Sequence, residues 1–212
     1  MKQLTVIATA LLLTTVAISF ALWADVLKIQ LVAYTGNVDV EFGSYSVKEY
    51  VGFPDGSGGW SFVPEGSDPE AKDVGQCTVA LQDIENEENT SLGTSAGNND
   101  LDLNITITNG YPGYNCTVTF EVVNKGTIPV KLYFFDKDYN RLTPLPATFT
   151  ISNAVECTLS GEDAALVDPL NSATYTLSCV VQRDASENAQ YSTQIYIQAR
   201  QWNEPLVIGP SG

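Results

Sequence analysis

The 212-residue sequence predicts an all-β fold, a jelly-roll-like β-sandwich with an extended N-terminal strand. About ten short segments alternate apolar and polar residues, which is the pattern of strands with one buried face. Turn-forming Gly, Pro, Asn and Ser separate most of these segments. No window after residue 24 has the period of an amphipathic helix. No boundary divides residues 36–212 into two cores, so we expect one domain there.

Residues 1–21 have the features of a signal peptide. Lys2 supplies a basic start, the stretch from Gln3 to Ala24 carries no charge, and Ala21 closes a small-x-small cleavage site. Cleavage after Ala24 is a second candidate boundary. The alternative is an uncleaved membrane anchor, because a run of about 20 apolar residues spans a bilayer. We expect contact with the membrane only through this segment during export.

Residues 22–35 follow as a strand at a free terminus. One face of this strand carries the alternating apolar residues Leu27, Ile29, Leu31 and Ala33. A terminal strand either pairs within its own fold or pairs with another molecule. Gly36, directly after it, is a natural hinge.

The rest of the chain predicts a series of short strands and two long loops. The strands are expected at residues 37–42, 77–84, 101–108, 116–123, 129–135, 147–151, 154–159, 174–181 and 191–200. The clearest of them is 101–108, with Leu101, Leu103, Ile105 and Ile107 turned inward. The loops are expected at 52–75, which is rich in Gly and Pro and contains Trp60, and at 85–100, which is acidic.

The four cysteines predict structural disulfides. They are Cys77, Cys116, Cys157 and Cys179, and each lies in phase with apolar neighbours, so all four should point inward. Four cysteines allow three pairings. Sequence proximity favours Cys77–Cys116 and Cys157–Cys179; free buried thiols are the alternative. Disulfides suit an exported protein.

The charge excludes several classes of partner. Removal of residues 1–21 takes away Lys2, so nine of the ten basic residues remain against 25 acidic ones, a formal charge of −16. Nucleic acid and anionic lipid would be repelled. The chain has no histidine, which excludes Ser-His-Asp and Cys-His catalytic pairs, and no cysteine lies in a zinc-type pair. We expect no catalytic residue, no metal site and no cofactor.

Two further motifs bear on the surface. Asp136 to Asn140 resembles the start of a calcium loop, but Arg141 replaces the glycine at its sixth position, so a solvated hairpin turn is the preferred reading. Sequons for N-glycosylation start at Asn89, Asn104 and Asn115. The first falls in a loop and the other two on outward phases of strands, so we expect all three to be accessible.

The stretch from Ile105 to Lys131, "ITITNGYPGYNCTVTFEVVNKGTIPVK", resembles the TasA/camelysin family of exported fibre-forming proteins. Two further segments match in the same order, "YTGNVDVEF" near the start of the domain and "IYIQARQWNE" near its end. The nearest likeness is to archaeal subunits of bundling pili. The cysteines and the short C-terminus depart from bacterial TasA, so its matrix partners do not carry over. Camelysin has been regarded as a protease, but this chain lacks histidines for a zinc mechanism.

The resemblance implies a secreted pilus or biofilm subunit whose N-terminal strand completes the sheet of the next identical subunit. The product is an extracellular filament at or near the cell surface, with lateral bundling between filaments. A monomeric jelly-roll adhesin or carbohydrate-binding module, with the loop around Trp60 as its site, is the first alternative. A glycan-acting hydrolase is the second. Assembly state separates the first two readings, and activity that depends on one Asp or Glu would support the third.

Overall fold

The computed structural model describes residues 35–67, 70, 73–82, 102–186, 189, 191 and 193–206. Residues from Gly36 onward form one compact unit, separate from Met1–Thr35. The predicted signal peptide, the apolar face of the predicted terminal strand (Leu27, Ile29, Leu31 and Ala33) and Asn89 lie outside the described residues.

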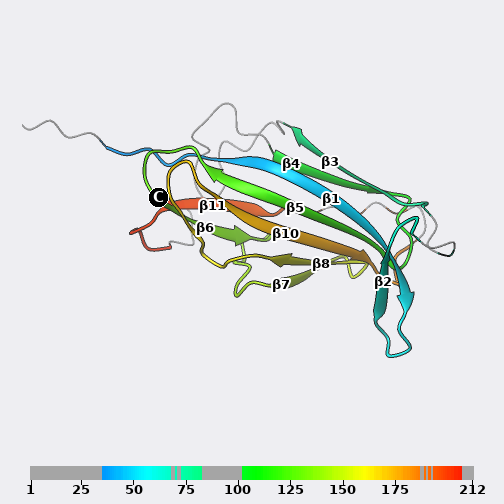
Figure 1. Cartoon of the computed structure of the whole chain (residues 1–212). Coiled ribbons are helices and arrows are strands. Elements are labelled where there is room, and N and C mark those ends of the chain that lie inside the picture. Colours follow the sequence, from blue (N-terminus) through cyan, green and yellow to red (C-terminus); the bar gives the residue numbers. More distant parts are fainter. Residues whose placement is uncertain are drawn as a thin grey trace, which may run out of the picture. The chain divides into compact units, whose positions relative to one another are not determined.

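The described part of the chain is built from β-strands, which confirms the predicted all-β class (Figure 1). The strands are β1 (Val40–Pro54), β2 (Trp60–Pro64), β3 (Gln76–Gln82), β4 (Asp102–Thr108), β5 (Tyr114–Asn124), β6 (Val130–Phe135), β7 (Ala147–Ile151), β8 (Val155–Ser160), β9 (Leu166–Val167), β10 (Ser172–Val181) and β11 (Tyr196–Gln201). Jelly-roll connectivity stays a prediction. Within these residues no helix is long and apolar enough to cross a membrane.

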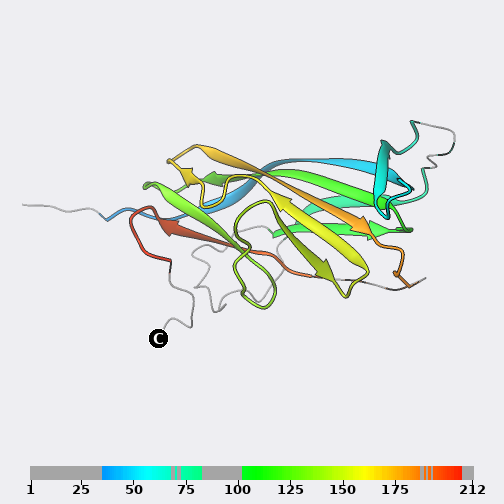
Figure 2. The ribbon, with the colours of Figure 1, turned by 90° about the horizontal axis from the view of Figure 1, so that it is seen from below.

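A six-stranded antiparallel sheet, in the order β2-β1-β5-β10-β8-β7, forms one layer. Its central strand β5 alternates buried Val118, Phe120 and Val122 with half-buried Thr117 and Thr119, so its apolar face is turned to the core. Two small sheets, β3-β4 and β11-β6-β9, contribute to the same core from the other side. The result is a β-sandwich whose second layer comes in two pieces (Figures 1 and 2).

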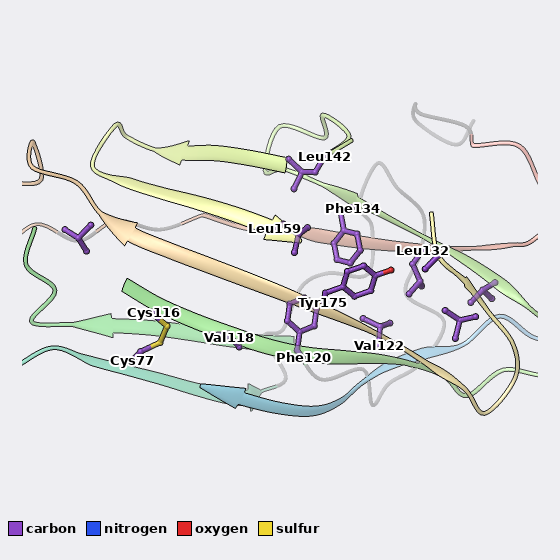
Figure 3. Packing of buried hydrophobic residues seen from close by; sticks show 14 of the residues in the cluster. Cys77, Cys116, Val118, Phe120, Val122, Leu132, Phe134, Leu142, Leu159 and Tyr175 are labelled. Atoms are coloured by element: carbon purple, nitrogen blue, oxygen red, sulfur yellow. A yellow bond between two sulfur atoms is a disulfide. The ribbon is translucent and has the colours of Figure 1, made fainter. Parts of the chain in front are cut away.

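Aromatic rings join the layers at the centre of the core. The Tyr175 ring lies between Phe134 of β6, at 4.5 Å between centroids, and Phe120 of β5, at 6.0 Å (Figure 3). Phe42 of β1 contacts the other edge of Phe120 at 5.7 Å. Such aromatic pairs add about 0.5–1.5 kcal/mol each to the gain from area burial.

The segment 52–75, predicted as a loop, instead contains a hairpin. β1 runs on to Pro54, and β2 pairs with it from Tyr50↔Pro64 to Pro54↔Trp60. The turn between them is held by Asp55, whose Oδ1 accepts hydrogen bonds from the Ser57 and Gly59 amides at 2.8 and 2.9 Å. The glycines that suggested a loop are the residues of this turn; Gly56 and Gly58 have φ values of 81° and 98°.

Both predicted disulfides are present. Cys77 of β3 is bonded to Cys116 of β5, and Cys157 of β8 to Cys179 of β10. The first links the β3-β4 sheet to the six-stranded sheet, as Figure 3 shows. The second joins residues directly opposite each other on neighbouring strands. Disulfides form in oxidising compartments, so the pair fits an extracellular protein.

Candidate functional site

The β4 strand has an open edge. It pairs with β3 over its whole length, from Asp102↔Gln82 to Thr108↔Gln76, and no other described strand pairs with it. Its inward-facing residues Leu103, Ile105 and Ile107 pack against the core but are only half-buried. By contrast, the inward residues of β5 are buried. Apolar side chains at this edge therefore keep surface that an additional strand would cover.

The opposite edge of the same small sheet is already occupied. On the side of β3 that faces β1, the Tyr45 hydroxyl donates a hydrogen bond to the Val79 carbonyl at 3.2 Å. The Glu49 carboxylate accepts one from the Cys77 amide. Two side chains of β1 thus take up backbone groups on that edge, which leaves β4 as the open edge.

The β11 strand lies at the end of its sheet. It pairs with β6 from Tyr196↔Phe135 to Gln201↔Val130, and among the described strands it has no other neighbour. Ile197 and Ala199 face the core and are half-buried, as is Ile195 before the strand. The apolar side chains of β11 are thus as incompletely covered as those of β4.

The two small sheets lie over different halves of the six-stranded sheet. The disulfide fixes β3 above Cys116, near the start of β5. The β6 strand lies above Tyr175, which is in register with Phe120 further along β5. The second layer therefore comes in two pieces. We call β4, β11 and the half-buried apolar side chains of these two strands the interrupted layer.

The chain enters the domain at a rigid junction. The Asn37 amide donates to the Thr127 hydroxyl at 2.9 Å, and the Thr127 amide donates back to the Asn37 carbonyl at 3.0 Å. The Asp39 carbonyl accepts from the amides of Lys125 and Gly126. A side chain on Gly126 would collide with the Asn37 carbonyl, so glycine is required at this close approach.

A fully buried asparagine holds this junction together. The Asn124 amide nitrogen donates to the carbonyls of Ile128, at 2.8 Å, and Val167, at 2.9 Å. Its Oδ1 accepts from the Gly126 amide at 2.9 Å. One side chain thus ties the β5–β6 turn to the strand β9. We call this end of the domain, formed by residues 37–39, 125–129, 166–171 and 202, the anchor end (left in Figure 1).

The sequence analysis did not identify this role of Asn124. Its only signal was the Asn-Lys-Gly turn that follows β5. The hydrogen bond to Val167 joins residues 43 positions apart, and sequence spacing does not reveal such a contact.

The two described sequons differ in accessibility. Asn104 lies on β4, on the face opposite Ile105, and is half-buried. Asn115 also has the outward phase, but it is only 7% exposed, so the expected accessibility is wrong there. Its Oδ1 accepts hydrogen bonds from Thr117 at 3.0 Å and Ser178 at 3.1 Å. The central position of β5, between β1 and β10, encloses a side chain that alternation alone would place in solvent.

Trp60 borders a shallow hollow of about 340 Å³, lined mainly by polar residues. The Arg183 guanidinium lies 4.9 Å from the centroid of the indole ring. Carbons of the ring lie so close to Gly113 that a Cβ on this glycine would collide with them, and a Cβ on Gly52 would be in tight contact with the ring. The indole is thus held between backbone and guanidinium, which is how a tryptophan that covers the edge of a core behaves.

A half-buried carboxylate network beside the first disulfide was also missed. Glu49 accepts hydrogen bonds from the Tyr114 hydroxyl and the Cys77 amide. Glu65 accepts from the amides of Val74 and Gly75 and from the Tyr111 hydroxyl. Burial, and after it the charge of Glu65, raises the pKa of Tyr111 to about 12; burial and the hydrogen bond to Glu49 also raise the pKa of Tyr114. The network stabilises the connection into β3.

The Asp136–Asn140 turn has its carboxylate occupied. Asp136 Oδ1 accepts from the amides of Asp138 and Asn140, and its Oδ2 accepts from the Asn140 side chain. Burial opposes ionisation of Asp136, but these hydrogen bonds outweigh it and lower the pKa. This geometry is that of an Asx turn and supports the hairpin reading. Within the described residues no cluster of three metal-ligating side chains is found.

Comparison of the chain with protein-family models, curated proteins and solved structures finds no match. The resemblance to fibre-forming proteins therefore stays a prediction.

Proposed function

We propose that the protein is a structural subunit of an extracellular filament that polymerises by donor-strand complementation. In this proposal residues 22–35 of one subunit enter the interrupted layer of the next and pair with the edge of β4. The observation that carries it is that β4 ends its sheet among the described strands, beside half-buried apolar side chains of β4 and β11. Main-chain pairing supplies affinity in such complexes, and alternate side chains entering pockets supply register.

The predicted strand matches this acceptor in chemistry. Leu27, Ile29 and Leu31 alternate with polar Lys28 and Gln30, so one face is apolar and the other polar. Burying each of the three apolar side chains contributes about 1.5–3 kcal/mol before the cost of ordering the strand. A contact in which each subunit donates a strand and accepts another is heterologous, so it extends into a fibre.

An assembly experiment tests the proposal. Purified wild-type protein should form fibres visible by electron microscopy and ladders resistant to sodium dodecyl sulfate. Ile29→Asp should place an unpaired charge among apolar groups and abolish both, while the subunit stays soluble. Lys28→Asp is the matched control, because it changes the polar face and should leave assembly intact.

A peptide experiment tests the mechanism separately. Protein that starts at Gly36 should bind a synthetic Leu22–Thr35 peptide and gain thermal stability, because a ligand of the folded state stabilises it. The same peptide with Ile29→Asp should not bind. Normal filaments formed by Ile29→Asp protein, or by protein that starts at Gly36, would end the donor-strand proposal.

The hollow beside Trp60 favours a second candidate, a carbohydrate-binding module. Its polar lining, which includes Asn153, Glu156 and Gln182, offers hydrogen-bonding groups for sugar hydroxyls. A monomeric wild-type protein that binds a glycan and loses the binding on Trp60→Ala would favour this function over the filament.

A further inference from the structure

Three exposed apolar side chains belong to the anchor end. Leu170 is 80% exposed, Leu166 56% and Trp202 50%. All three are tied to the β5–β6 connection: the Leu170 amide donates to the Asn124 carbonyl at 2.8 Å, the Trp202 amide to the Pro129 carbonyl at 3.1 Å, and Leu166 pairs with Lys131. We call these three side chains the anchor-end patch. Apolar groups held at one rigid end of a domain are characteristic of an interaction surface.

The conformation of Leu170 strengthens this reading. Its φ is 66°, in the left-handed region that Gly and Asn adopt far more readily than a bulky residue. The turn around it is fixed by the hydrogen bonds from Leu170 to Asn124 and from Asn171 to Asp168. Leucine there gains neither from burial nor from backbone preference within the subunit. A leucine in this position makes sense if a partner covers it.

The length of the chain decides which partner this is. The anchored Asn37 lies four residues after Ala33, the last apolar residue of the predicted donor strand. Four fully extended residues reach about 14 Å at most. A subunit that holds Ala33 must therefore sit directly against the anchor end of the subunit that donates it.

We propose that the anchor-end patch docks onto a second copy of this chain, the same subunit that accepts the donor strand. This inference rests on the proposed function and adds a second, body-to-body contact to it. The accepting subunit uses its own anchor end to contact the next subunit along the fibre. The anchor-end patch of the donating subunit therefore meets a different surface of the accepting subunit. Because the two contacting surfaces differ, the contact repeats along the fibre.

Two variants test the proposal, and each should preserve the stability of the isolated subunit while it weakens fibre assembly. Leu170→Asn and Leu170→Gly both suit the left-handed backbone, so the melting temperature of the isolated subunit should stay or rise. Each removes the exposed leucine, so the protein concentration needed for assembly should rise at least about tenfold. Val74→Asn is the matched control: Val74 is 55% exposed, before β3 and away from the anchor end, and assembly should be unchanged.

A binding measurement separates this contact from donor-strand insertion. The Leu22–Thr35 peptide carries no domain, so its affinity for Leu170→Asn protein starting at Gly36 should equal its affinity for the unsubstituted domain. Weaker assembly together with unchanged peptide binding supports the body-to-body contact. If Leu170→Asn protein assembled into fibres at the same concentration as wild-type protein, the body-to-body contact would be overturned and the filament function would stand. A wild-type chain that neither assembles nor binds the peptide would overturn both.

Discussion

Replacement of Asn124 by aspartate isolates the hydrogen bonds that hold the anchor end. The Asn124 amide nitrogen donates to two buried carbonyls, and the side chain is 0% exposed. Asn124→Asp keeps the shape but removes both donors, which leaves the Ile128 and Val167 carbonyls facing a carboxylate. A buried group that loses its partner costs about 1–3 kcal/mol, and a buried charge without a partner adds to this. We expect the free energy of unfolding to fall by at least about 3 kcal/mol.

The matched control is Asn115→Asp. Asn115 is also buried, but its Oδ1 accepts hydrogen bonds from Thr117 and Ser178, and a carboxylate retains both. Calorimetry at neutral pH should show a melting temperature lowered by roughly 6–12 °C for Asn124→Asp, since 1 kcal/mol corresponds to about 2–4 °C in a domain of this size. The reduction for Asn115→Asp should be much smaller.

The stability of the Asn124→Asp variant should depend on pH. Burial disfavours the charged form, so the introduced carboxyl at position 124 should have its pKa raised in the folded state above the unfolded value of about 3.9. Stability should therefore fall as pH rises through that folded pKa and should recover as pH is lowered. Equal stability of the two variants at neutral pH would refute the assignment of Asn124 as the donor that joins the two segments.

The remaining predictions concern the disulfides, the tyrosines and the sequons. The free energy of unfolding should fall by about 4 kcal/mol in the Cys77→Ser/Cys116→Ser double variant and by slightly less in Cys157→Ser/Cys179→Ser, because the closed loops span 39 and 22 residues. Chemical denaturation measures both losses. Peptide mapping that linked Cys116 to Cys179, its neighbour across the strands, would contradict the pairing. Burial raises the pKa values of Tyr111 and Tyr175 from 10.0 to about 12, so the stability they contribute is complete below pH 10 and should be lost as pH rises towards 12. Tyr111→Phe should reduce this loss in alkaline unfolding curves. An unchanged curve would count against the role of Tyr111. In a host that glycosylates, site-resolved mass spectrometry should find glycan on Asn104 in preference to Asn115; high occupancy at Asn115 would mean that it is modified before β5 is enclosed.

The sequence was sufficient for features that depend on local periodicity. Alternation along a strand is a property of the strand itself, so the faces of β4 and β5 and the inward direction of Cys77 and Cys116 followed directly. Sequence proximity favoured the disulfide pairing that the structure shows, because each pair joins strands separated by a single excursion of the chain.

The tertiary structure decided what depends on neighbours in space. Periodicity gives the phase of Asn115, but only its place between β1 and β10 encloses it. The turn-forming glycines near Gly56 predicted a long loop, but the pairing of β1 with β2 makes them part of a hairpin turn. The positions of β4 and β11 at the ends of their sheets and the exposure of Leu170 are likewise set by which strands are adjacent. Strand adjacency arises from long-range packing, and a local pattern carries no information about which partner a strand will meet.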